Sequence, residues 1–426
     1  MTTTLALPPC SHEEILSTIR FPVLPPESCS QNVEGETYGT ATRTRGWVGV
    51  EVPGQWGRDI LKGGSVHSAL ARRIARKVKK LRGYKLLFIR EPASRGSQSQ
   101  QKRQTHRIFI VNSAQGKQHT YRFEVPHLEK MLSLPLHSPQ KIKGVKKVPH
   151  SLIFLCTHGK RDRCCALAGR PIAQYLKQVR PPETVWECSH IGGHRLAPTG
   201  VVLPAGYMYG RLTPATALMA VVSLEEYQVP SLAGIRGCSS LAAVHQVAEV
   251  AVREYLAQSG EEPTISQLSF SSVKSEKSSK KKKNLKKSRE YRQLKKKYAR
   301  LRKSRLWREQ KARAKVLRKK LSYGQACVEE LVELNELNRR YREVKEQYRR
   351  EKYALLHGGQ DTGSSQVFSS AHKGVQCSIV HHEDGRSWVV VTAKTKTAPA
   401  RESCGKGEKP LSTFKVLSVE KASHRR

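Results

Sequence analysis

Acidic residues are scarce in this chain. Its 426 residues include 35 Asp or Glu against 77 Lys or Arg, which gives a formal net charge of +42. Apolar residues make up 38%, below the usual share of a globular protein, so we expect part of the chain to lie outside any packed core. The charge excess predicts attraction to polyanions and carries no information about the fold.

Long apolar runs are missing as well. No run approaches the ~20 residues of a membrane-spanning helix, and the N-terminal sequence MTTTLALPPC lacks the basic and apolar regions of a secretory signal. We therefore expect a cytoplasmic protein without a membrane partner. Disulfide scaffolds are normally short and secreted, so the 10 cysteines of this chain indicate metal or redox chemistry instead.

The first α/β pattern follows a Pro- and Ser-rich N-terminal segment. Residues 65–82 are amphipathic, with Leu70, Ile74 and Val78 on one stripe of a predicted helix and basic residues away from it. Strand patterns lie before and after this helix. They are a strand with a Pro-Gly turn in 46–57, and strands at 84–89, 107–112 and 120–125.

A second pattern, from residue 151, combines strands and helices in another order. An apolar run at 151–156 predicts a buried strand, and a helix pattern at 165–178 follows it. The order β-α-β-β-β-α, with cysteines at a strand–helix junction, is typical of thioredoxin-like domains. Its later elements are a strand at 184–188, a hairpin turning at Ala205-Gly206, a helix after Thr213 and a helix at 239–258.

The composition changes after residue 259. Residues 274–320 contain 24 Lys or Arg and 3 Glu, a net charge of +21 that is half of the excess of the whole chain. Apolar residues recur at spacings of three and four on both sides of the sequence SYG at 322–324, which predicts a helical hairpin with a Gly turn. Its charge indicates nucleic-acid binding, and the alternative is a solvated surface without a partner.

The C-terminal segment follows a flexible joint at 357–365. Asp384-Gly385 is a strong turn signal between two strand patterns, and residues 411–420 could add a strand. We therefore predict an α/β protein with five parts. They are an irregular segment at 1–37, an N-terminal α/β domain at 38–145, a thioredoxin-like domain at 146–262, a Lys/Arg-rich helical-hairpin insertion at 263–365 and a C-terminal β-hairpin segment at 366–426.

Two pairs of soft metal ligands lie near the middle of the chain. Cys156 and Cys165 have eight residues between them, and His190 and His194 have three. The first pair begins at the end of a predicted buried strand, and the second lies in the loop HIGGH directly after another strand. Both strand ends can open onto one edge of a sheet, and the two glycines would let both imidazoles face one point.

Thiolate and imidazole together suit iron–sulfur or zinc chemistry. One candidate is a [2Fe–2S] centre with thiolates on one iron and imidazoles on the other, whose neutral ligands raise the reduction potential. A structural Cys2His2 zinc site usually has about two to four residues between its cysteines, so the spacing here fits poorly. A third candidate is a nucleophilic cysteine in a phosphate-binding loop, but neither Arg161 nor Arg163 lies at the usual distance from it. Four unrelated residues in loops and core are the alternative to any site.

The residues around the two ligand pairs, and the other cysteines, indicate a function less specifically. The basic loop between the cysteines would lower the pKa values of their thiols and offset the negative charge of a cluster. His158, in this loop, is more typical of a surface or loop residue than of a ligand, although its position would allow a supporting role. Cys188 is more typical of core packing, and Cys404 could be a redox thiol or have no role.

The two ligand segments also carry a family resemblance. FLCTHGKRDRCCALAGRPIA, at 154–173, and VWECSHIGGHRLAPTGVVLPAGYMYGRL, at 185–212, resemble the sucrase/ferredoxin-like family of thioredoxin-like ferredoxins. Residues 38–61 and 384–406 resemble its bacterial members. The resemblance implies a thioredoxin-like ferredoxin domain whose [2Fe–2S] cluster is held by Cys-x8-Cys and His-x3-His. The implied ligands are Cys156, Cys165, His190 and His194, with Cys164 of the Cys-Cys doublet as the alternative to Cys165.

Motif and resemblance together predict electron transfer or redox sensing with an unknown redox partner. An exposed imidazole nitrogen can titrate when its iron changes charge, so we expect proton-coupled electron transfer. The alternative is a polyanion-binding protein, for RNA or DNA, with a structural zinc site on the same residues. We find no positioned carboxylate pair for glycoside hydrolysis, so sucrase activity is not predicted and a redox protein is favoured over a hydrolase.

Overall fold

Internal contacts group the chain into two units. A computed structural model describes residues 12–93 except 27, 32 and 34, residues 105–272, residues 289–322, part of 329–351, and residues 375–422. The first unit is Met1–Ser272 with Ser369–Arg426, and the second is Val273–Phe368. None of the helices in the described part of the chain combines the length and the apolar character that a membrane span requires.

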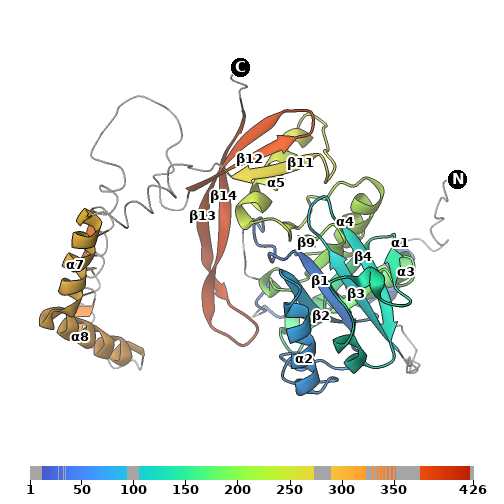
Figure 1. Cartoon of the computed structure of the whole chain (residues 1–426), viewed down its shortest axis with the longest axis horizontal. Helices are drawn as coiled ribbons and strands as arrows, with labels where there is room; N and C mark the ends of the chain where they lie inside the picture. The colour runs from blue at the N-terminus through green and yellow to red at the C-terminus, as the bar shows by residue number, and fades with distance from the viewer. Residues whose placement is uncertain are drawn as a thin grey trace. The chain divides into compact units, whose positions relative to one another are not determined.

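A mixed ten-stranded sheet forms the centre of the first unit (Figure 1). Its strands are β1 (Gly46–Glu51), β2 (Tyr84–Arg90), β3 (His106–Asn112), β4 (His119–Val125), β5 (Lys146–Val148), β6 (Leu152–Cys156), β7 (Val185–Cys188), β8 (Gly200–Leu203), β9 (Tyr207–Tyr209) and β10 (Ile235–Cys238). Their order is β10-β9-β8-β6-β7-β2-β1-β3-β4-β5. The pairs β6–β7 and β1–β2 are parallel and the others antiparallel, so the sheet is mixed and the predicted α/β class is confirmed.

The helices that the sequence predicted in the first unit begin and end close to their predicted positions. The amphipathic pattern at 65–82 forms α2, which buries Ala71, Ile74 and Val78. Thr213 caps α4, because its hydroxyl accepts a hydrogen bond from the Thr216 N–H at 3.2 Å. The helices are α1 (His12–Thr18), α2 (Ser68–Lys79), α3 (Arg163–Val179), α4 (Pro214–Glu226) and α5 (Ala243–Ala257), with short 3-10 helices η1 (Leu128–Leu132), η2 (Pro139–Lys141) and η3 (His194–Leu196).

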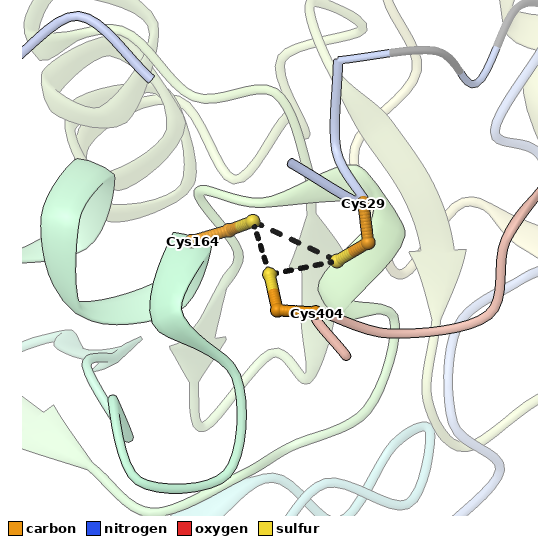
Figure 2. A group of neighbouring side chains, drawn as sticks. All are labelled: Cys29, Cys164 and Cys404. Atoms are coloured by element: carbon orange, nitrogen blue, oxygen red, sulfur yellow. Dashed lines mark hydrogen bonds between the residues drawn. The ribbon is translucent and has the colours of Figure 1, made fainter. Parts of the chain in front are cut away.

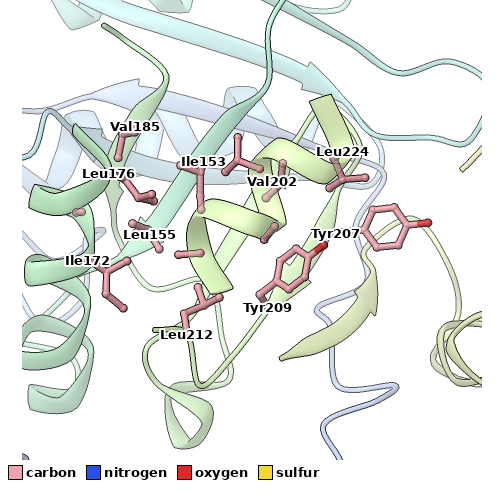
Figure 3. Close-up of a cluster of buried hydrophobic side chains, with 14 of the residues drawn as sticks. Ile153, Leu155, Ile172, Leu176, Val185, Val202, Tyr207, Tyr209, Leu212 and Leu224 are labelled. Atoms are coloured by element: carbon pink, nitrogen blue, oxygen red, sulfur yellow. The ribbon is translucent and has the colours of Figure 1, made fainter. Parts of the chain in front are cut away.

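Strand alternation on β6 sorts its side chains between two cores. Ile153 and Leu155 pack with Ile172 and Leu176 of α3 (Figure 3). The intervening side chains of β6, which include Cys156, belong to a second buried cluster on the opposite face of the sheet. The period of two along this strand therefore places the Cys156 thiol away from the α3–α4 core and in the buried cluster that also contains Cys29, Cys164, Cys165 and Cys188.

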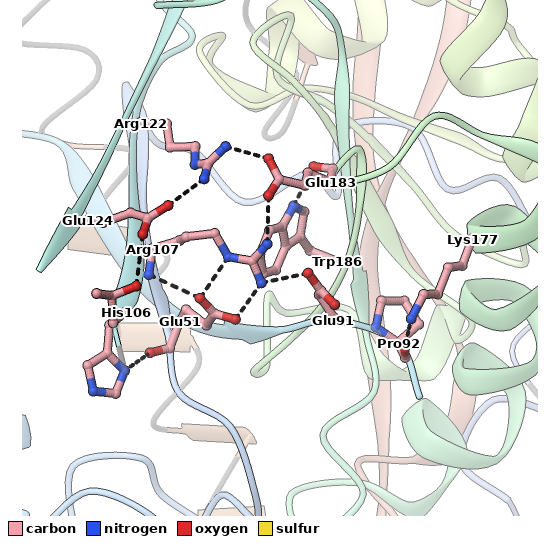
Figure 4. A network of polar contacts seen from close by, with 11 residues as sticks. Glu51, Glu91, Pro92, His106, Arg107, Arg122, Glu124, Lys177, Glu183 and Trp186 are labelled. Carbon is pink, nitrogen blue, oxygen red and sulfur yellow. Dashed lines mark hydrogen bonds and ion pairs between the residues drawn. The ribbon is translucent and has the colours of Figure 1, made fainter. Parts of the chain in front are cut away.

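The large sheet runs through both the predicted N-terminal domain and the predicted thioredoxin-like domain. Strands β2 and β7 pair at Ile89 and Cys188. A buried ion-pair network adds to this junction, because Arg107 of β3 contacts Glu51 of β1 at 2.6 Å and Glu183, just before β7, at 3.0 Å (Figure 4). The two regions share a continuous sheet and polar network.

A four-stranded antiparallel sheet completes the first unit, where the sequence predicted a C-terminal β-hairpin. The hairpin at Asp384-Gly385 is present as β12 and β13, and residues 411–420 lie in β14. Strand β11 was not predicted, because its partner β12 lies beyond the second unit in the sequence. The order is β11 (Leu268–Ser272), β12 (Val375–His382), β13 (Ser387–Arg401) and β14 (Glu408–Lys421).

The N-terminal segment also differs from the prediction. Residues 1–37 were expected to be irregular, but α1 forms within them. Ile15 and Ile19, one helical turn apart in sequence, are buried in the core that contains α3. The Pro- and Ser-rich composition of the segment gave no helix signal. This short helix is stabilised by tertiary packing rather than by its own length.

The second unit contains α7 (Arg289–Lys303) and α8 (Arg305–Ser322). The break between them was not predicted, and Ser304 explains it, because its hydroxyl accepts a hydrogen bond from the Trp307 N–H and caps α8. Later helical residues contact both helices in antiparallel order. Tyr298 packs on Tyr348, and Leu317 clusters with Leu334. The Gly turn predicted at 322–324 lies, beyond Ser322, outside the described residues.

Candidate metal centre

The two predicted cysteine ligands lie at the junction of β6 and α3. Cys156 ends β6, and Cys165 lies in the first turn of α3. Both side chains are fully buried. Gly169 allows the helix to approach the strand, since a Cβ atom there would lie 2.5 Å from the Cys156 carbonyl oxygen. The loop of six residues between strand and helix therefore brings the two thiols together.

His190 reaches the same point from the neighbouring strand. Strand β7 pairs with β6 so that Cys188 lies opposite Cys156, and His190 follows two residues later. Its Nδ1 atom lies 3.9 Å from the Cys156 sulfur. The ligand atoms of Cys156, Cys165 and His190 all lie within 4.8 Å of one another. Three of the four predicted ligands therefore meet at one edge of the sheet.

His194 lies beside this group and is not part of its tightest cluster. Its Nδ1 atom is 3.3 Å from Nε2 of His190 and 3.4 Å from a carboxylate oxygen of Asp162. Its Nε2 atom is 2.5 Å from the Glu402 carbonyl oxygen, which can accept a hydrogen bond from the ring N–H. The structure thus brings the two histidines together and orients His194 through the C-terminal sheet.

The glycines of the HIGGH loop have the role that the sequence predicted. Gly192 and Gly193 have φ angles of +92° and +79°, in the left-handed region that favours glycine. A Cβ atom at Gly193 would also lie 2.4 Å from the guanidinium group of Arg236. This buried guanidinium donates a hydrogen bond to the Gly192 carbonyl at 3.1 Å. Close packing on Arg236 therefore fixes the loop that carries both imidazoles.

His158 supports His190 from the basic loop. The backbone N–H of His190 donates a hydrogen bond to Nδ1 of His158 at 3.3 Å, and Nε2 of His158 lies 2.7 Å from the Gly57 carbonyl oxygen. These partners require the tautomer protonated on Nε2. Burial lowers the pKa of His158, which favours this neutral form. The sequence favoured a surface or loop position, but the side chain is buried.

Electrostatic interactions shift the pKa values of the two candidate cysteine ligands in opposite directions. The neighbouring Cys165 thiol, followed by His190, lowers the pKa of Cys156 well below its ordinary value. The interaction with Cys156 and burial both raise the pKa of Cys165. The pair therefore favours one thiolate and one thiol, and a bound cation would favour deprotonation of both. The main causes are the adjacent thiol and imidazole, rather than the basic loop residues that the sequence suggested.

A second thiol group lies next to this centre, and the sequence did not predict it. Cys29, Cys164 and Cys404 come from three distant segments of the chain and converge (Figure 2). Cys164, considered above as the alternative ligand, points into this group instead of toward Cys156. The only sequence signal was the Cys164-Cys165 doublet, and it gave no indication of the partners Cys29 and Cys404.

The donor atoms of these groups are those of a soft metal site. Buried thiols and imidazoles suit zinc or iron–sulfur chemistry, and the Cys156 group could hold a metal or a cluster. The chain matches no curated protein and no solved structure. Residues 37–228 match the sucrase/ferredoxin-like family model. This part of the chain, which includes all four predicted ligands, belongs to the sucrase/ferredoxin-like family.

Proposed function

We propose that Cys156, Cys165, His190 and His194 hold a [2Fe–2S] cluster and that the protein acts in electron transfer or redox sensing. The observation that carries this proposal is the convergence of the first three ligand atoms within 4.8 Å, with His194 3.3 Å from His190. The eight-residue gap between the cysteines disfavours the usual zinc spacing, whereas strand and helix packing brings their thiols together.

The fold around the ligands supports a thioredoxin-like ferredoxin domain. Strand β6, helix α3 and strand β7 form a parallel β-α-β unit, and β8 and β9 extend the sheet antiparallel beside β6. This arrangement follows the β-α-β-β-β-α order of the sequence. The ligands project from its strand–helix junction and from the loop after β7, so the sheet supplies a rigid base for both pairs.

The cysteines and the histidines would have different roles at this site. When bound, such a cluster accepts and releases one electron, and imidazole in place of thiolate raises its potential. Both thiols are fully buried, which protects them from solvent, whereas His190 and His194 are partly exposed. The histidine side of the site is therefore where a proton can be exchanged with water. The electron donor and acceptor would be protein or small-molecule redox partners approaching this side.

The direct test is the composition of the full-length protein purified without oxygen. We expect two iron atoms and two sulfides per chain, with visible charge-transfer bands and an electron paramagnetic resonance signal after one-electron reduction. Cys156→Ala should lose them. Cys188→Ala is the matched control, because Cys188 is an equally buried thiol directly opposite on β7 and should retain the iron. A colourless wild type with zinc on these four residues would refute the cluster.

Proton coupling has its own test at the histidine pair. We expect the reduction potential of the wild type to fall as pH rises, because the reduced cluster holds a proton more tightly. Replacing His194 with Cys adds an anionic ligand, so the potential should drop and lose much of its pH dependence. Equal pH dependence in wild type and His194→Cys would contradict a role for His194 as the proton-exchanging ligand.

A second activity, polyanion binding, is favoured by the charge of residues 274–320. Their net charge of +21 far exceeds that of an ordinary exposed helix face, and it lies in the separate second unit. Phosphate contacts by such a segment release counterions, so binding to RNA or heparin should weaken steeply with salt. We propose this binding as an additional property, independent of the cluster.

Removing the basic segment tests that property. Strands β11 and β12 pair with Ser272 opposite Ser378, so a short turn in place of 274–374 can join them without breaking the sheet. This variant should lose retention on heparin and RNA columns and keep its iron. Unchanged retention with an unchanged salt dependence would show that the second unit does not bind polyanions.

A further inference from the structure

The second thiol group brings three cysteines into mutual contact. The sulfur–sulfur distances are 3.0 Å for Cys164 and Cys404, 3.6 Å for Cys29 and Cys164, and 3.7 Å for Cys29 and Cys404. Cys29 and Cys164 are buried, and Cys404 is partly exposed. Each sulfur comes from a different part of the first unit: the N-terminal segment, the first turn of α3 and the turn between β13 and β14 (Figure 2).

These distances are typical of ligands to a single metal ion. Two sulfur ligands of a tetrahedral zinc ion, each about 2.3 Å from the metal, lie about 3.8 Å apart. Two of the three observed distances are close to this value, and the third is shorter. Ligands on different metal atoms of a cluster would need wider separation. A disulfide between Cys164 and Cys404 would leave Cys29 without a role, whereas one metal ion uses all three thiols. We propose that Cys29, Cys164 and Cys404 bind a zinc ion, at a site separate from the cluster.

The surroundings of the three thiols fit a metal site. Asp162 is buried, its Oδ1 atom lies 3.6 Å from the Cys29 sulfur, and it accepts a hydrogen bond from the Cys404 N–H at 2.8 Å. This carboxylate fixes the turn that carries Cys404. Such hydrogen-bonding partners orient ligands and tune affinity in metal sites.

A basic cavity gives access to the site from solvent. It has a volume of about 330 Å³ and includes Cys404 in its wall. Three thiolates and one zinc ion carry a net charge of −1, which the cations around the cavity can offset. They also favour an anion or a hydroxide as the fourth zinc ligand, from the open side. The basic residues of the wall are Arg58, Lys160, Arg161, Arg163 and Arg401.

The zinc ion would connect segments that are distant in the chain. It would join the N-terminal segment and the β13–β14 turn to α3, which also carries a cluster ligand. Glu402, whose carbonyl oxygen lies 2.5 Å from Nε2 of His194, is two residues from Cys404. The zinc site would therefore hold the backbone that orients one of the proposed cluster ligands.

The experiment measures zinc and iron together in the full-length protein, after loading with Zn²⁺ alone and removal of weakly bound metal. We expect one zinc per chain in the wild type and in Cys156→Ala, which lacks the proposed cluster. Cys29→Ser and Cys404→Ser should lose that zinc and keep their iron. The control is Cys377→Ser, on β12, which should keep both metals. A wild type that holds this zinc but contains no iron would overturn only the cluster, because the two sites share no ligand.

Three outcomes would overturn the zinc site. They are a wild type without tightly bound zinc, a Cys29→Ser variant that keeps it, and a freshly isolated protein in which peptide mapping finds Cys164 and Cys404 joined by a disulfide. If the serine variants fail to fold, X-ray absorption at the zinc edge of the wild type decides the question. Three sulfur neighbours support the site, and a shell of nitrogen and oxygen alone refutes it.

Discussion

Cys164 and Cys165 are adjacent in the first turn of α3 and belong to different thiol groups. Cys165 joins Cys156 and His190, whereas Cys164 joins Cys29 and Cys404. Successive side chains on a helix point about 100° apart, so one doublet can supply two sites. The first group is formed by residues within 35 positions of the sequence, and the second by residues from 29 to 404. Proximity in sequence made the first group predictable and left the second hidden.

The two groups are not isolated from each other. Asp162 lies between them, with one carboxylate oxygen 3.4 Å from Nδ1 of His194 and the other 3.6 Å from the Cys29 sulfur. A change in charge on one side therefore shifts the electrostatic potential on the other, because the Asp162 carboxylate and the Cys29 thiol are buried, where solvent screens charge weakly. The following predictions separate the two groups, beginning with the largest expected effect.

Substitutions in the Cys164-Cys165 doublet should give the largest difference between the two thiol groups. Cys165→Ala should lose all cluster iron and its visible spectrum, because it removes one of two thiolate ligands. Cys164→Ala should keep the spectrum and lose the zinc. Metal analysis and absorption spectra of the two variants measure both effects. Loss of iron in Cys164→Ala with retention in Cys165→Ala would reverse the ligand assignment.

Asp162→Asn tests the link between the groups. The substitution keeps the shape of the side chain and removes its negative charge. Zinc affinity should fall about 10–100-fold, as is usual when a hydrogen-bonding partner of a ligand is lost. The cluster potential should rise, because a negative charge beside His194 disappears. Competition with a zinc chelator and redox titration measure the two effects. Asp59→Asn, which removes another carboxylate of the first unit, is the control and should change neither.

Gly193→Ala should disturb the histidine side of the first group alone. The left-handed φ of +79° costs strain on the order of 1–3 kcal/mol for alanine, and its Cβ atom would meet the Arg236 guanidinium. We expect a lower melting temperature and less iron per chain, with zinc retained. Gly116→Ala is the matched control, since Gly116 has a φ of +71° and open space around its Cβ position. Equal iron in the two variants would rule out the Arg236 contact as the cause.

The smallest effect concerns the pH dependence of stability through His158. Burial lowers the pKa of His158 in the folded protein below the usual value of about 6.5 that the unfolded chain retains. Below that value the unfolded state binds more protons, so the free energy of unfolding should decrease as pH falls from 7 to 5. His158→Gln should make this decrease smaller.

Denaturant unfolding in the cluster-free Cys156→Ala background measures this slope without interference from iron loss. His127→Gln, at an exposed position, is the control and should leave the slope unchanged. His150 and His245, whose pKa values are also lowered by burial, are present in every variant and cancel in the comparison. If His158→Gln and His127→Gln give the same slope, His158 is not the titrating group.

The sequence by itself determined most strands and helices of the large sheet and the choice of the four proposed ligands. Local periodicity decides which face of a strand or helix is apolar, so α2, α3 and β6 followed from their residue patterns. The spacing of Cys156, Cys165, His190 and His194 could be interpreted because the cysteine pair begins at the end of one strand and the histidine pair follows another. The glycines of HIGGH were predictable for the same reason, as the turn needs a left-handed backbone.

Only the tertiary structure decided which distant residues meet. Helix α1 and strand β11 are stabilised by partners far away in the sequence, so local patterns could not reveal them. In the sequence, Cys29 and Cys404 are isolated cysteines, and the position of His158 is typical of a loop residue. Their positions depend on how three segments pack around the first turn of α3, and such packing is set by the summed burial of many side chains. A second metal site could therefore be inferred only once the chain was folded.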